Sequence, residues 1–205
     1  MKLYITPTSP YARVARIVVL EKLLSDRVEI VEARTRTPDS PYYRVNPSGR
    51  VPFLVTDDGV GMEDSGLIAA FLDRLDGRPS LTPPPADAAW AYGRLESYAR
   101  SLTDGISVWV REMRRPEGER SPTILAHELA RGTRLADFWE REIGHPAMQG
   151  PLNLAQLLLL VGLDFAAAFG MAELEKGRPK LAAWCRALRE RPSVAATAPS
   201  SARKQ

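Results

Sequence analysis

The sequence predicts a small α/β domain followed by an all-helical domain. Within residues 1–77, strand and helix patterns follow one another in the order βαβ and then ββα. A proline-rich break follows at residues 78–86, and residues 87–205 carry helical patterns without a strand pattern among them. We therefore expect two domains, 1–77 and 87–205, joined by a linker at 78–86.

The first three elements make up the βαβ part. Residues 2–6 alternate between polar and apolar side chains, which predicts a strand. After a turn, apolar residues recur at helical spacing; Ser9 suits the N-cap of this helix and Pro10 its first position. Residues 27–32 alternate again, and a helical crossover between two strands implies that they are parallel.

The ββα part begins after a polar segment at residues 34–44. The turn-forming residues of Asn46–Leu54 run into an apolar strand that starts at Phe53. The sequence Asp57-Asp58-Gly59 is typical of a hairpin turn, so residues 60–62 should return as an antiparallel strand. A helix with one apolar face is then expected to begin at Asp64-Ser65.

The second domain should contain four long helices. We expect them at residues 87–113, 123–143, 154–169 and from 179 to about 191. The third is the most apolar segment of the chain, so it should form the centre of the domain. Asn153 and Gln156 suit a capping box at its start. The basic, Ala/Ser-rich tail at residues 195–205 is expected to fray.

Composition excludes several classes of function. The net charge of +3 is slight beside 28 basic residues, and therefore does not indicate a nucleic-acid partner. The single cysteine, Cys185, allows no intrachain disulfide, and the two histidines form no metal-binding motif with it, so no metal is expected. The longest apolar run is far shorter than a membrane span, and the start lacks a secretory pattern. We expect a cytoplasmic protein without a membrane partner.

Three short segments at one end of the first domain could carry chemistry. Ser9 could donate its hydroxyl to a thiolate at a helix N-terminus, or it could only cap the helix. The backbone of Val51, before Pro52, could pair with a peptide-like ligand, or the pair could simply form a corner. Asp64-Ser65 offers a carboxylate for an ammonium group and donors for a carboxylate, or again only a cap. Together they suit a short peptide with a thiol, an amine and carboxylates.

The chain resembles the cytosolic glutathione S-transferases over essentially its whole length. The resemblance rests on Ser9-Pro10-Tyr11 with Arg13, on Asn46–Leu54, and on Asp64-Ser65 followed by Ile68. It implies a thioredoxin-like first domain, a helical second domain and, in most members, a homodimer. The first part is similar to a bacterial subgroup that carries a Ser-Pro-Tyr or Ser-Pro-Phe motif.

The resemblance also implies roles for individual residues. Val51 would pair its backbone with the cysteinyl part of glutathione, and Asp64 and Ser65 would hold the γ-glutamyl amine and carboxylate. Ser9 would stabilise the thiolate, and Arg50 would be a candidate for the glycine carboxylate. The glutathione-binding residues implied in this way are Ser9, Arg50, Val51, Pro52, Asp64 and Ser65.

Three further expectations follow from the resemblance. The Val51–Pro52 peptide should be cis, and Arg36 is a second candidate for the glycine carboxylate. A pocket for the second substrate would lie between the domains; its walls would come from Tyr11, Tyr98, Leu102, Trp109 and Met113. Most of the last four could instead belong to the core of the helical domain.

The expected function is that of a glutathione S-transferase. Glutathione would be the co-substrate, no metal would be needed, and the thiolate would attack a small hydrophobic electrophile in a detoxification reaction. The start of the first helix carries no cysteine, so thiol–disulfide exchange is not expected. Cys185 lies among apolar residues of the last helix and should be a buried small hydrophobe.

Other functions stay open at this point. The chain could be a catalytically weak or inactive binding or regulatory module that acts through protein partners. The same site could also support glutathione-dependent isomerisation or peroxide reduction.

Overall fold

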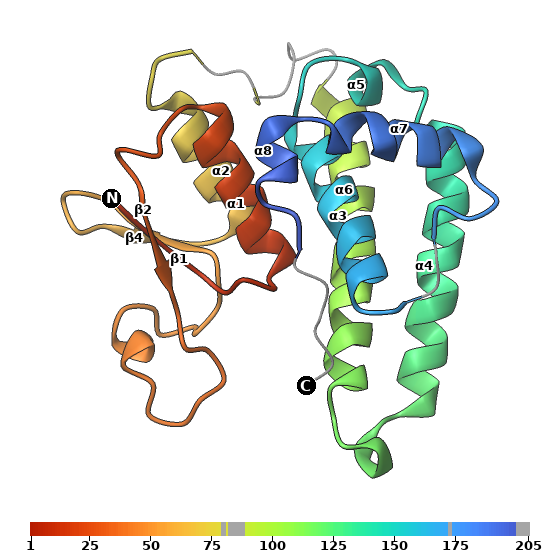
Figure 1. Ribbon diagram of the computed structural model, residues 1–205, viewed down its shortest axis with the longest axis horizontal. Coiled ribbons are helices and arrows are strands. Elements are labelled where there is room, and N and C mark those ends of the chain that lie inside the picture. Colours follow the sequence, from red (N-terminus) through yellow and green to blue (C-terminus); the bar gives the residue numbers. More distant parts are fainter. Residues whose placement is uncertain (79–80, 82–88, 172–173, 200–205) are drawn as a thin grey trace. The chain divides into compact units, whose positions relative to one another are not determined.

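The computed structural model describes residues 1–78, 81, 89–171 and 174–199 (Figure 1). The chain divides into two compact units, Met1–Thr82 and Pro83–Gln205. Apart from residues 78 and 81, the predicted linker lies outside the described residues.

The first unit is built on a four-stranded sheet in the order β2-β1-β3-β4. Its strands are, in chain order, β1 (Lys2–Ile5), β2 (Glu29–Glu32), β3 (Phe53–Val55) and β4 (Gly61–Met62). Strands β1 and β2 are parallel, whereas β3 runs antiparallel to both β1 and β4. This topology confirms the predicted βαβ-ββα, thioredoxin-like fold of the first part of the chain.

Two helices, α1 (Pro10–Glu21) and α2 (Ser65–Arg74), cover one face of this sheet (Figure 1). They also pack against each other. Alternate strand residues point to this face, and Leu3 and Leu54, which face each other in the β1–β3 register, are fully buried there. The core of the unit therefore lies between the sheet and the two helices.

A smaller apolar cluster covers the opposite face. Tyr4 and Phe53 point to this side, and both pack with Tyr42 from a short 3₁₀ helix, η1 (Pro41–Arg44). The rings of Tyr4 and Tyr42 lie 5.5 Å apart between centroids. The η1 helix falls within residues 34–44, which were expected only to be polar. It brings the buried side chain of Tyr42 to the end of the sheet where β1 leads into α1.

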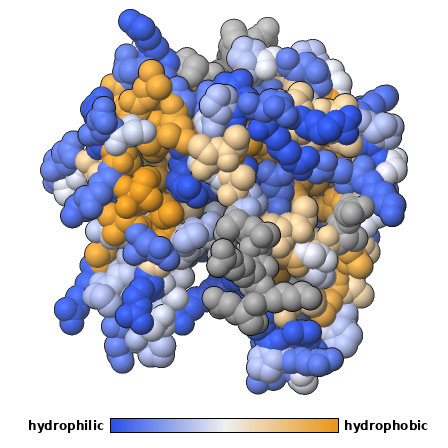
Figure 2. All heavy atoms as spheres, viewed as in Figure 1, coloured by the Kyte–Doolittle hydropathy of each residue, from blue (hydrophilic) through white to orange (hydrophobic). Residues whose placement is uncertain are grey.

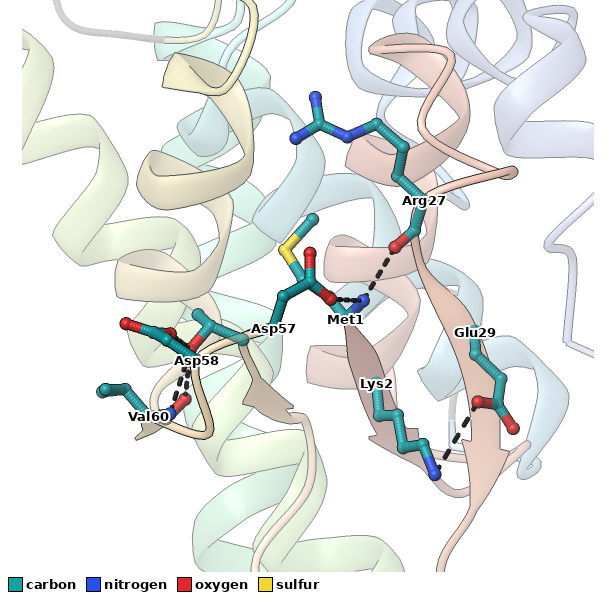
Figure 3. A network of polar contacts seen from close by, with 8 residues as sticks. Met1, Lys2, Arg27, Glu29, Asp57, Asp58 and Val60 are labelled. Carbon is teal, nitrogen blue, oxygen red and sulfur yellow. Dashed lines mark hydrogen bonds and ion pairs between the residues drawn. The ribbon is translucent and has the colours of Figure 1, made fainter.

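The other end of the sheet is closed by the β3–β4 turn, in which Gly59 takes the positive φ of 84° that a tight turn requires. The ammonium group of Met1 lies 2.5 Å from Oδ1 of Asp57 and 2.9 Å from the carbonyl oxygen of Arg27 (Figure 3). These contacts tie the start of β1 to the residues before β2 and to the β3–β4 turn. They anchor the sheet at the end that lies away from the start of α1.

Among the described residues of the second unit, all regular elements are helices. Its helices are, in chain order, α3 (Ala89–Met113), η2 (Glu117–Glu119), α4 (Pro122–Glu142), α5 (Pro146–Gln149), α6 (Leu154–Ala168), α7 (Pro179–Arg189) and α8 (Pro192–Ala195). Helix α6 packs along α3, which also packs against α4. Every residue of α6 from Ala155 to Ala166 is buried, which confirms that this apolar helix forms the centre of the unit.

The start of α6 carries the predicted capping box. Oδ1 of Asn153 accepts from the N–H of Gln156, and Oε1 of Gln156 accepts from the N–H of Asn153, both at 3.1 Å. Two short helices, α5 and α8, were not expected from the sequence. The expectation of a frayed tail is wrong for residues 195–199, because Thr197 is buried and its hydroxyl donates to the carbonyl of Ser193 at 2.9 Å. Residues 200–205 lie outside the described part.

The surface of each unit carries hydrophobic side chains among hydrophilic ones (Figure 2). Leu23 and Trp90 are the most exposed of the large apolar residues, at 87% and 89%. Single exposed apolar residues are common in folded proteins. Among the described helices, none combines the length and the apolar character that a membrane span needs.

Candidate functional site

Three segments of the first unit converge where β1 leads into α1. The register of β1 and β3, continued by two residues, places Val51 beside Thr6, just before Ser9. The register of β3 and β4, continued in the same way, places Pro52 beside Asp64. The sheet thus brings the start of α1, the Val51–Pro52 corner and the start of α2 to one end of the unit.

Ser9 is the N-cap of α1. Its backbone is extended, and its Oγ accepts from the N–H of Ala12 at 3.2 Å, while Pro10 occupies the first helical position, as predicted. A hydroxyl carries one donor and two acceptor lone pairs, and the cap uses one acceptor. The hydroxyl hydrogen can therefore donate to an anion at the positive end of the helix dipole while the cap stays intact.

Val51 presents main-chain groups at the corner before β3. The Val51–Pro52 peptide is cis, as the resemblance predicts, and the Glu63–Asp64 peptide is cis as well. The side chain of Val51 packs against the cluster around Tyr42. In the described part of the chain, no backbone hydrogen bond reaches the N–H or the carbonyl of Val51. A peptide ligand could pair with both groups.

Asp64 and Ser65 have different roles at the start of α2. Asp64 is the N-cap, and its Oδ1 accepts from the N–H groups of Gly66 and Leu67 at 3.0 and 3.1 Å. Ser65 is buried, and its Oγ has no hydrogen-bond partner among the described residues. Its N–H also lacks a backbone acceptor there. The N–H and the hydroxyl of Ser65 are therefore two donors at the helix start that a carboxylate could engage.

The two arginines expected near a glycine carboxylate are exposed. The main chain of Arg50 is held by the loop, since its N–H donates to Oγ of Ser48 at 3.2 Å. Arg36 has a positive φ of 56°. The role of either guanidinium group in binding stays a prediction.

A polar network behind Val51 was not foreseen from the sequence. Asn46 is 2% exposed, and its Nδ2 donates to the carbonyl of Arg50 at 3.0 Å and to Oε2 of Glu63 at 3.1 Å. The hydroxyl of Tyr42 donates to the same Arg50 carbonyl at 2.5 Å. Burial raises the pKa of Tyr42, so the hydroxyl keeps its proton at neutral pH. In the sequence, Asn46 has the appearance of a turn former only, and Tyr42 stands in a polar segment.

The residues predicted for a second-substrate pocket belong to different units. Tyr98, Leu102, Trp109 and Met113 lie along one stripe of α3 at spacings of whole helical turns. Leu102 is buried in the core of its unit, and Tyr98 stacks on Phe138 of α4 with 4.2 Å between ring centroids. The fifth residue, Tyr11, lies on α1 of the first unit. A pocket that all five residues share stays a prediction.

The only cysteine of the chain is remote from solvent. Cys185 is fully buried in α7, and burial raises the pKa of its thiol well above the usual range. The expectation of a buried small hydrophobe is confirmed, and a buried neutral thiol is a poor nucleophile.

Comparison with known proteins agrees with this geometry. Residues 3–80 match the family model of the glutathione S-transferase N-terminal domain. The uncharacterized GST-like protein YibF of Escherichia coli is 28% identical over 186 residues, which cover 90% of this chain and 87% of that protein. The first unit therefore matches the N-terminal domain of the glutathione S-transferases, and most of the chain is similar to a GST-like protein.

Two further relatives extend the similarity over both units. Glutathione S-transferase 2 of Saccharomyces cerevisiae is 27% identical over 209 residues, which cover 95% of this chain and 88% of that protein. A glutathione S-transferase from Methylobacillus flagellatus, solved with glutathione bound, has a TM-score of 0.85 and 28% identity. The match covers 97% of this chain and 99% of that chain. The fold of this family is therefore shared along the whole chain, including its helical second unit.

Proposed function

We propose that this protein is a glutathione S-transferase that binds glutathione in its first unit and stabilises the thiolate for attack on a small hydrophobic electrophile. The observation that carries the proposal is the pair of donors on Ser65, its N–H and its buried hydroxyl, which have no acceptor among the described residues. They lie at a helix start beside the Val51–Pro52 corner, where the main chain of Val51 is also open to a peptide.

Each part of glutathione finds a matching group in this arrangement. The γ-glutamyl carboxylate accepts from the N–H and hydroxyl of Ser65, and the γ-glutamyl ammonium group pairs with the carboxylate of Asp64. The cysteinyl residue pairs its main chain with Val51. Arg50 is exposed on the same loop and can meet the glycine carboxylate.

The thiol then lies near the N-terminus of α1. A free thiol has a pKa of about 8.5. Lowering it by about 2 units requires roughly 2.7 kcal/mol of preferential stabilisation of the thiolate. A hydrogen bond from Ser9 to the charged sulfur contributes about 1.5–3 kcal/mol, and the helix dipole contributes about 0.3–1 kcal/mol. The two effects together are of the required size.

The wider setting is part of the same proposal. We expect a cytoplasmic homodimer with a role in detoxification, as the family resemblance implies.

Calorimetric titration tests the proposal with two ligands, glutathione and cysteinylglycine, which lacks the γ-glutamyl residue. Glutathione should bind, and cysteinylglycine should bind at least about tenfold more weakly. In a separate activity assay, the protein should conjugate an activated chloronitrobenzene to glutathione. Equal affinity for the two peptides would show that Asp64 and Ser65 do not bind the γ-glutamyl group. Binding of glutathione without turnover of any electrophile would favour a binding or regulatory module.

A further inference from the structure

We propose that Tyr42, Asn46 and Glu63 act as positioning residues that aim the main chain of Val51 and hold it at a fixed distance from Asp64-Ser65. The inference rests on the proposed function, because the ligand that Val51 would meet is the cysteinyl part of glutathione. The three residues are called the loop clamp below. They are not themselves expected to touch the reacting sulfur.

The first element of the clamp acts on the Arg50 carbonyl. The hydroxyl of Tyr42 and Nδ2 of Asn46 both donate to this oxygen, at 2.5 and 3.0 Å. The carbonyl of Arg50 and the N–H of Val51 belong to one planar peptide unit and point in opposite directions across it. Holding the carbonyl toward Tyr42 and Asn46 therefore turns the N–H of Val51 away from the loop interior.

The second element connects the loop to the start of α2. Oε2 of Glu63 accepts from Nδ2 of Asn46 at 3.1 Å and from Oγ of Ser48 at 2.5 Å. Glu63 directly precedes Asp64, so these bonds link the loop that carries Val51 to the residues that would hold the γ-glutamyl group. Hydrogen bonds to a carboxylate are stronger than neutral ones, which favours a fixed spacing between the two contact points.

Asn46 is suited to this place by its full set of hydrogen bonds. Its amide group has two N–H donors, which are used by the Arg50 carbonyl and by Glu63. Its Oδ1 accepts from the N–H of Ser48 at 3.0 Å. An aspartate in the same position has the same shape but no donor, and it would bring a second carboxylate next to Glu63.

Tyr42 holds Val51 in a second way. Its ring belongs to the apolar cluster against which the side chain of Val51 packs. The same residue thus fixes the Val51 side chain through its ring and the preceding peptide through its hydroxyl. Tyr43, the next residue, carries the same side chain, but its hydroxyl makes no hydrogen bond within the described residues.

The clamp should act on affinity and leave the thiolate unchanged. Val51 would contact the main chain of the middle residue of the peptide ligand. The thiol would instead be stabilised by Ser9, which lies on a separate segment. Loss of one neutral hydrogen bond corresponds to roughly a 3- to 10-fold change in an equilibrium constant. We expect Tyr42→Phe to raise the Kd and KM for glutathione by about this factor, with the pKa of the bound thiol unchanged.

The experiment compares Tyr42→Phe with Tyr43→Phe, which removes a hydroxyl next to it that has no clamp contact. Asn46→Asp should weaken glutathione binding more than Tyr42→Phe does. Glu63→Ala should weaken it as well, and Glu63→Gln, which keeps an acceptor, should restore part of the affinity. Hydrogen exchange of residues 46–51 in the ligand-free protein provides a readout that does not depend on glutathione. Exchange there should be faster in Tyr42→Phe and unchanged in Tyr43→Phe.

The outcomes separate the clamp from the proposed function. If the wild-type protein binds glutathione but Tyr42→Phe and Tyr43→Phe have the same Kd, or if Tyr42→Phe changes kcat and the thiol pKa instead of KM, the clamp inference is wrong. The variants could speed hydrogen exchange of residues 46–51 although the wild-type protein does not bind glutathione. In that case the proposed function is wrong, and so is the positioning of Val51 for glutathione. The loop contacts themselves would still be confirmed. Unchanged exchange in Tyr42→Phe contradicts the structural part directly.

Discussion

The carboxylate of Asp64 caps the two amides that follow Ser65 and leaves the amide and hydroxyl of Ser65 itself without an acceptor among the described residues. A buried hydroxyl without a partner costs roughly 1–3 kcal/mol of stability. Such a cost is typical of a group that serves a ligand more than it serves the fold.

We therefore predict opposite effects of Ser65→Ala on stability and on binding. The variant should be as stable as the wild-type protein or more stable by about 1 kcal/mol, because it removes an unsatisfied buried group. Its affinity for glutathione should fall by about tenfold. Chemical denaturation and calorimetry measure the two quantities.

Ser107→Ala is the matched control. Ser107 on α3 also has a buried hydroxyl without a partner among the described residues. This variant should show the same small change in stability with unchanged glutathione affinity. Glutathione affinity that stays at the wild-type value in Ser65→Ala would exclude Ser65 from the site.

Asp64→Asn tests charge separately from capping. Asparagine and aspartate cap helices about equally well, so the free energy of unfolding should change by less than about 0.5 kcal/mol. Only the charged side chain pairs with the γ-glutamyl ammonium group, so the Kd should rise by about tenfold. A variant that binds glutathione as tightly as the wild-type protein would show that Asp64 is a cap only.

Local rules were sufficient to predict much of the first unit. The N-cap at Ser9, the turn at Gly59 and the start of α2 at Asp64 follow from residue preferences over a few neighbouring positions, and the structure confirms them. The convergence of Ser9, Val51 and Asp64 follows once the strand order is known. For these features, the short-range pattern and the global fold agree.

Other features depend on contacts between residues that are distant in sequence. The hydroxyl of Tyr42 donates to the Arg50 carbonyl only because η1 packs against one face of the sheet. Glu63 accepts a hydrogen bond from Asn46, which lies 17 residues earlier in the sequence. Ile30 follows the alternating pattern of a buried strand, yet it is 45% exposed because β2 forms the edge of the sheet. Burial of Thr197 likewise depends on how α8 packs. A single sequence carries no local signal for such contacts.

The raised pKa of Tyr42 predicts a pH dependence of stability at alkaline pH. Burial favours the neutral phenol in the folded state. The group then contributes stability that is fully present below its unfolded pKa of about 10 and that is lost as pH rises through the folded pKa. Tyr42→Phe should flatten this alkaline decline in the free energy of unfolding. Parallel curves for the wild-type protein and Tyr42→Phe would contradict the assignment.

Cys185 should take no part in the reaction. Because its thiol is buried and its pKa is raised, the native protein should react with thiol-alkylating reagents only as fast as it unfolds. Cys185→Ala should leave turnover unchanged and lower the free energy of unfolding by about 1 kcal/mol, since it leaves a small cavity. Rapid alkylation of the native protein, or loss of turnover in this variant with glutathione still bound, would argue for a reactive cysteine.

Ser9 carries the central claim, and a cap variant elsewhere in the chain provides its control. Ser121 has the same arrangement at the start of α4, with Pro122 at the first helical position and Oγ accepting from the N–H of Ile124 at 3.3 Å. Ser9→Ala and Ser121→Ala should each lower the free energy of unfolding by about 0.5–2 kcal/mol. Ser9→Asp keeps the cap but replaces the donor by a negative charge.

The most direct measurement is the pKa of the glutathione thiol bound to these proteins, followed by the ultraviolet absorbance of the thiolate. The wild-type protein and Ser121→Ala should share one lowered pKa. Ser9→Ala should raise this pKa by about 1–2 units, Ser9→Asp should raise it at least as far, and turnover at neutral pH should fall in step. If the bound thiol titrates identically in the wild-type protein and in Ser9→Ala, then Ser9 only caps α1 and the proposed mechanism is wrong.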